Sequence, residues 1–96
     1  MSSTPAIKAV EGAIAKAMAL LEADTNQVRR ARTAEALSNA MRVASEQFAE
    51  QRSAALVELR DDGWSLADMK AEFGIARSRL SQLINREEYR QSRRGR

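Results

Sequence analysis

The sequence predicts an all-α fold, and three features of its composition support this prediction. Alanine, which has the highest helix propensity, occurs 18 times among the 96 residues. One proline, four glycines and four aromatic residues leave little for a β-sandwich or barrel, which needs turn residues and strand formers. The chain has no cysteine and no histidine, which excludes disulfides, Cys/His zinc sites, a thiol nucleophile and the usual general base near neutral pH. We therefore expect no metal, no cofactor and no enzymatic activity.

The first predicted helix covers residues 5–23. Thr4 is a suitable N-cap, and Pro5 is tolerated at the first helical position. Apolar residues then recur every three or four positions, as on one face of an amphipathic helix. The residues of this apolar stripe are Ile7, Val10, Ile14, Ala17, Met18 and Leu21.

A second helical region follows a turn at residues 24–26. Asp24 and Gln27 have the spacing of a capping box, so Asp24 is expected to cap the next helix. Residues 27–62 contain no glycine or proline, and their apolar positions are mostly three or four apart. This region is either one helix of about nine turns or two helices that break near Thr33 or Ser45. Gly63 suits the left-handed position just after a helix end.

Residues 64–85 predict two further helices joined by a tight turn. Ser65 and Asp68 resemble a capping box at the start of a short helix, Leu66–Phe73. Gly74 ends that helix, and a new one begins near Ala76–Arg77. Ile75, Leu80, Leu83 and Ile84 are expected to point inward. Arg77, Ser78, Arg79, Ser81, Gln82 and Asn85 are expected to point outward.

Residues 65–84 resemble the helix-turn-helix in the fourth conserved region of bacterial primary sigma factors. That family reads approximately T-L-E-E-I-G-x-E-F-N-V-T-R-E-R-I-R-Q-I, and this chain reads S-L-A-D-M-K-A-E-F-G-I-A-R-S-R-L-S-Q-L. The identical positions are Leu66, Glu72, Phe73, Arg77, Arg79 and Gln82. Lys70 replaces a small residue of the motif, and Ala76 replaces a Thr or Ser cap. The sigma regions that bind core polymerase and melt promoters have no counterpart, so only the local motif is similar.

The resemblance implies that the second helix of this motif enters the major groove of DNA. The residues aligned with Arg77, Ser78, Ser81 and Gln82 would face base edges or phosphates, and their side-chain types suit that role. Residues 1–62 carry eight basic and nine acidic side chains (−1), whereas residues 63–96 carry eight and four (+4), a charge pattern typical of a polyanion-binding segment. The candidate DNA-binding residues are Ser65, Lys70, Arg77, Ser78, Arg79, Ser81, Gln82, Asn85, Arg86, Arg90, Arg93 and Arg94.

Three regions follow from these patterns. Residues 45–88 are predicted to form a tri-helical helix-turn-helix module, and residues 89–96 a basic flexible tail that serves as a DNA-contacting arm or as a solubilising segment. The module core would combine Phe48, Leu56, Leu59, Trp64, Phe73, Leu80 and Leu83. Residues 1–44 are then surplus and are predicted to form a dimeric helical bundle, with an intramolecular cap as the alternative. The candidate dimerisation residues are Ile7, Val10, Ile14, Met18, Leu21, Val28, Leu37 and Met41.

The expected function is sequence-specific binding of double-stranded DNA by a homodimeric prokaryotic transcriptional regulator. Higher-order cooperative assembly on repeated sites is left open. The alternative is a protein-interaction adaptor for transcription or DNA-partition machinery. No targeting segment or membrane-spanning run is visible in the sequence, so we expect a cytoplasmic, nucleoid-associated protein that does not bind membranes.

Overall fold

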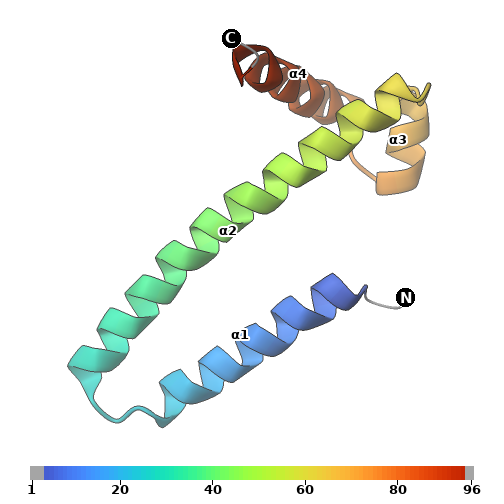
Figure 1. Cartoon of the computed structure of the whole chain (residues 1–96). Helices are drawn as coiled ribbons and strands as arrows, with labels where there is room; N and C mark the ends of the chain where they lie inside the picture. Colours follow the sequence, from blue (N-terminus) through green and yellow to red (C-terminus); the bar gives the residue numbers. More distant parts are fainter. Residues whose placement is uncertain (1–3, 95–96) are drawn as a thin grey trace. The chain divides into compact units, whose positions relative to one another are not determined.

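The computed structural model describes residues 4–94, and this part of the chain is all-helical (Figure 1). Four helices follow one another: α1 Pro5–Ala23, α2 Gln27–Asp61, α3 Leu66–Phe73 and α4 Arg77–Arg94. The chain divides into two compact units, Met1–Arg42 and Val43–Arg96, called here the N-terminal and the C-terminal unit. The boundary lies inside α2. Among the described residues, no helix is both long and apolar enough to cross a membrane.

α1 begins and ends where the sequence predicts. The hydroxyl of Thr4 accepts a hydrogen bond from the backbone N–H of Ile7 at 3.3 Å, and Pro5 is the first helical residue. No described residue of α1 is buried. Six of the eight predicted dimerisation residues are exposed, and Leu21 and Leu37 are half-buried. The N-terminal unit therefore has apolar stripes but no interior of its own.

The turn between α1 and α2 differs from the prediction in one respect. Asn26, not Asp24, caps α2, because its side-chain oxygen accepts from the backbone N–H of Arg29 at 2.9 Å. Asp24 instead accepts from the backbone N–H of Asn26 at 2.9 Å and from the Arg29 guanidinium at 2.7 and 2.8 Å. These bonds, the one from Arg29 foremost, lower the pKa of Asp24 to about 2. The ionised Asp24 carboxylate thus stabilises the turn through its hydrogen bonds to Asn26 and Arg29.

α2 is a single helix of 35 residues, which decides between the two alternatives that the sequence left open. It ends in a Schellman motif. The N–H of Gly63 donates to the carbonyl of Arg60 at 2.9 Å, and the N–H of Trp64 donates to the carbonyl of Leu59 at 3.0 Å. Gly63 has φ +100°, a conformation that favours glycine. The predicted helix stop is confirmed.

The C-terminal unit contains the hydrophobic core. The buried apolar residues are Leu56, Val57, Met69, Leu80, Leu83 and Ile84, and Leu59, Trp64, Leu66 and Ile75 pack against them. Phe73 is exposed, although its ring stacks on Trp64 with centroids 6.4 Å apart. Phe48, also predicted in the core, is 59% exposed. Phe48 lies nine residues before Val57, which is two and a half helical turns and therefore the opposite side of α2.

Replacing Leu80 by alanine should destabilise the protein by about 2–5 kcal/mol, because Leu80 is fully buried and would leave a cavity. Phe48→Ala is the matched control and should change the free energy of unfolding by less than about 1 kcal/mol, as for other exposed positions. Urea unfolding followed by the fluorescence of Trp64, the single tryptophan, measures both. A larger loss for Phe48→Ala would contradict the observed core.

Candidate nucleic-acid interface

The junction between α3 and α4 is fixed by local hydrogen bonds. Ser65 and Asp68 form the predicted capping box: the Asp68 N–H donates to the Ser65 hydroxyl at 3.0 Å, and the Ser65 N–H donates to the Asp68 carboxylate at 2.9 Å. The bond from the Ser65 backbone is the main reason that the pKa of Asp68 is lowered. Gly74, with φ +70°, ends α3. Residues 75 and 76 then lead into α4.

The inner face of α4 is seated in the core. Leu80, Leu83 and Ile84 are buried, as predicted, and Glu87 is buried on the same face. Met69, fully buried on α3, belongs to the same cluster. Because successive residues of a helix are about 100° apart, fixing this face also fixes which side chains α4 turns outward.

The outward face of α4 is polar and basic. Ser78, Gln82 and Asn85 are exposed at spacings of four and three, so they lie along one side of the helix. Arg77 and Arg79 are exposed near its first turn, and Arg86 is exposed further along. Ser81 is half-buried, so its predicted outward orientation holds only in part. Lys70 and Ser65 are exposed on and before α3, where the Ser65 hydroxyl is engaged in the capping box.

Arg90, which was predicted to contact DNA from a flexible arm, is paired with carboxylates of its own chain. Its Nε donates to the Glu87 carboxylate at 2.9 Å, and its Nη1 lies 4.0 Å from a carboxylate oxygen of Glu50 on α2. Gln91 also donates to Glu87, at 2.9 Å. The Arg90 hydrogen bonds hold the pKa of Glu87 below its ordinary value of 4.5 although burial opposes this. A carboxylate that is 2% exposed needs such a partner, which sequence spacing could not reveal.

A second ion pair ties α4 to the end of α2. Arg60 lies 2.8 Å from the Glu88 carboxylate and 3.0 Å from that of Asp61. Both partners of the Arg60–Glu88 pair are partly exposed, so this pair is weaker than that of the buried Glu87. The two glutamates of α4 are therefore both engaged with arginines, one within α4 and one on α2.

The segment predicted as a flexible tail is helical as far as residue 94. Arg93 and Arg94 are exposed in the last turn of α4, and residues 95–96 lie outside the described part. Tyr89, which was not among the candidate residues, is exposed and accepts a hydrogen bond from the Arg93 guanidinium at 3.1 Å. Its spacing of four from Asn85 would have placed it on the same face.

These residues can donate and accept hydrogen bonds and can neutralise phosphate. Nowhere in residues 4–94 do three His, Cys, Asp or Glu side chains come together in a way that could hold a metal ion. The chain matches no protein-family model, no curated protein and no solved structure. The chemistry of the outward face of α4 is therefore what indicates a function.

Replacing Glu87 by glutamine should lower the free energy of unfolding by about 1–3 kcal/mol, because a neutral amide with one acceptor oxygen replaces the buried carboxylate that pairs with Arg90. The effect should depend on pH. The folded-state pKa is below the unfolded one, so the stabilisation is complete above the ordinary carboxyl pKa and is lost as the pH falls through the folded-state pKa. Thermal unfolding between neutral and acid pH tests this.

Glu88→Gln is the matched control, one residue along and partly exposed in its pair with Arg60. It should lose much less stability at neutral pH, because solvent screens that pair. Equal losses for the two variants, or a Glu87→Gln variant with the same acid sensitivity as the parent chain, would show that Glu87 does not anchor α4.

Proposed function

We propose that the chain is a sequence-specific binding protein for double-stranded DNA, in the manner of a prokaryotic transcriptional regulator, and that α3, the turn and α4 act as a helix-turn-helix. The observation that carries this proposal is the division of α4 into a buried apolar face and an exposed face of Ser78, Gln82 and Asn85 flanked by arginines. Association with the nucleoid would follow from this activity.

The shape and chemistry of α4 suit the major groove, which admits one α-helix. In helix-turn-helix proteins the early residues of the second helix reach base edges. Gln82 can pair with adenine through two hydrogen bonds, and Arg77 with guanine. Ser78 lies between them along the exposed side and can bond to a base or a phosphate.

The charge on α4 favours the same ligand. Six arginines and two glutamates lie in Arg77–Arg94, and both glutamates are engaged in ion pairs with Arg90 and Arg60. Five arginines of α4 are exposed: Arg77, Arg79, Arg86, Arg93 and Arg94. Phosphate contacts by such side chains supply much of the affinity of proteins for DNA.

The first backbone N–H groups of α4 are further hydrogen-bond donors. The first N–H groups of a helix need acceptors from outside it. Ala76, which precedes α4, has no side-chain oxygen to offer. A DNA phosphate at this end would accept those hydrogen bonds and lie at the positive end of the helix dipole. The absent cap, which departs from the sigma-factor pattern, is thus compatible with the proposed role.

The resemblance of residues 65–84 to the sigma-factor motif supports the proposal on independent grounds. It concerns the order and identity of residues along the chain, whereas the face of α4 concerns their exposure. Selection of bound fragments from random DNA would test the proposal directly and report any preferred sequence. Failure to enrich any sequence would contradict specific binding.

Arg77→Ala and Gln82→Ala should each cost about 1–3 kcal/mol of binding free energy at the preferred site and little on unrelated DNA, because they would remove base contacts. Fluorescence anisotropy with both DNAs measures the difference. Gln51→Ala, an exposed glutamine on α2, is the control and should change neither value. A loss that is equal on both DNAs would contradict base reading by these residues.

Replacing Arg93 and Arg94 together by glutamine should weaken binding to all sequences alike. The slope of log affinity against log salt concentration should fall by about 2, since each lost phosphate contact removes about 0.9. Arg52→Gln, at an exposed arginine of α2, is the control and should leave the slope unchanged. An unchanged slope in the double variant would show that the last turn of α4 does not contact phosphate.

A second candidate function is that of a protein-interaction adaptor. The exposed ring of Phe73, stacked on half-buried Trp64, favours it, because exposed aromatic pairs are common in protein interfaces. Asp62 and Glu72 lie beside Trp64 around one shallow hollow. An electrophoretic shift assay with mixed-sequence DNA at low salt separates the two candidates. No shift at micromolar protein would favour the adaptor.

A further inference from the structure

The N-terminal unit leaves large apolar side chains in solvent. Seven of them are between 38% and 66% exposed: Ile7, Val10, Ile14, Met18, Leu20, Val28 and Met41. No described residue of α1 is buried. Helices in proteins gain most of their stability from the packing of an apolar face. The hairpin of this unit, formed by α1, the turn and the first part of α2, therefore lacks a packed surface that would stabilise α1.

The apolar surface of α1 extends to two sides. Ile7, Ile14 and Met18 lie on one side of the helix, and Leu20, two residues after Met18, lies almost opposite. Only four of the 19 residues of α1 are charged: Lys8, Glu11, Lys16 and Glu22. A helix that is apolar on two sides needs more than one neighbouring helix, and within this unit α2 is the single neighbour.

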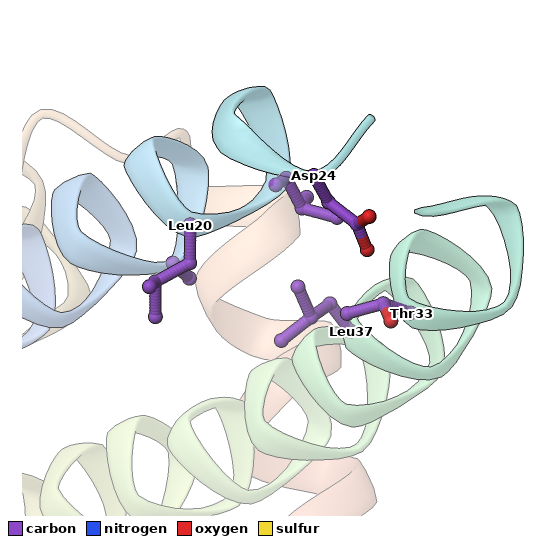
Figure 2. A pocket seen from close by; sticks show the side chains of 6 residues that line it. Leu20, Asp24, Thr33 and Leu37 are labelled. Carbon is purple, nitrogen blue, oxygen red and sulfur yellow. The ribbon is translucent and has the colours of Figure 1, made fainter. Parts of the chain in front are cut away.

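The base of the hairpin has room for additional side chains. A hollow of about 290 Å³ lies between α1 and the first turns of α2. Figure 2 shows Leu20 of α1 and Leu37 of α2 beside this hollow, with Asp24 and Thr33 nearer the turn. Ala17 and Leu21 complete the lining. The Asp24–Arg29 ion pair, at 2.7 Å, fixes the turn next to it.

We propose that the occupant of this surface is a second copy of the chain, and that two hairpins associate into a four-helix bundle. The apolar stripe of α1 in one copy would cover the hollow and the stripe of the other. The arrangement is isologous, as in most dimers, because the same surface is used twice. It assigns an interface role to Leu20, which the periodicity of the stripe alone does not include.

The exposed area agrees with this occupant. Summed over both sides of α1 and the start of α2, the seven residues leave roughly 700 Å² of surface in solvent, close to the ~800 Å² that each partner buries in a stable interface. The charge also agrees. α1 carries two lysines and two glutamates, a net charge of zero, so the α1 helices of two copies can pack against one another without net like-charge repulsion.

This proposal goes beyond DNA binding, and it is tested without DNA, so failure of one does not imply failure of the other. Light scattering after size exclusion should give twice the chain mass of 10.7 kDa and should approach the monomer mass on dilution. Introducing Ile14→Glu with Met18→Glu, or Leu20→Glu alone, should weaken dimerisation at least ~100-fold, because a charge would be buried without a partner.

Lys8→Glu is the matched control, since Lys8 lies on α1 about 80° around the helix from Met18 and about 120° from Leu20. It should leave the dimer intact. Because the glutamate variants can also lose the fold of the hairpin, the unmodified chain provides a second measurement. Its helix content by circular dichroism should fall on dilution together with its mass, as expected when folding is coupled to association.

Three results would overturn the proposal. The first is a constant monomer mass up to ~100 µM, which would leave a different protein, or the chain's own C-terminal unit, as the occupant. The second is a dimer that survives all three glutamate substitutions in α1. The third is equal disruption by Lys8→Glu, which would show that charge and not the apolar face controls association.

Discussion

The burial of one face of α4 is the constraint on which the rest of the C-terminal unit depends. Within residues 4–94, Leu80, Leu83 and Ile84 account for half of the six buried apolar residues of the core. The exposed face of the helix has no apolar contacts that could hold it in a chosen orientation. Every side chain that could reach a ligand is therefore placed indirectly, by residues that point away from it.

Ion pairs add to the packing that orients α4. Glu87 extends the buried face by one turn beyond Leu83, and Arg90 bridges it towards Glu50 of α2. A rotation of one residue, about 100°, would take the Glu87 carboxylate out of the interior and replace Gln82 on the outer face. Removing one partner of a buried ion pair leaves the other charge uncompensated, and this pair uses an arginine that could otherwise have contacted phosphate.

Features set by neighbouring residues could be predicted from the sequence, and features set by tertiary contacts could not. The cap at Thr4, the Ser65–Asp68 box and the stops at Gly63 and Gly74 depend on a few adjacent residues, so their positions were correct. The α2 cap was misplaced because Asp24, Thr25 and Asn26 are all able to cap and only the Arg29 contact separates their roles. The sequence placed Phe48 in the core because the many alanines of α2 do not indicate which side of that helix is buried. The ligand roles assigned to α4 stay predictions.

The two units differ in what they need in order to fold. The C-terminal unit encloses Met69 and Leu80 completely, so its helices cover one another within a single chain. The N-terminal unit encloses nothing in α1, so the free energy of ordering that helix must come from a surface outside the hairpin. If that surface is a second copy, pairing depends on protein concentration while the exposed face of α4 does not. Two coupled faces would then bind a two-fold symmetric target far more tightly than either alone, and the proposed affinity for DNA would depend on how much protein is present.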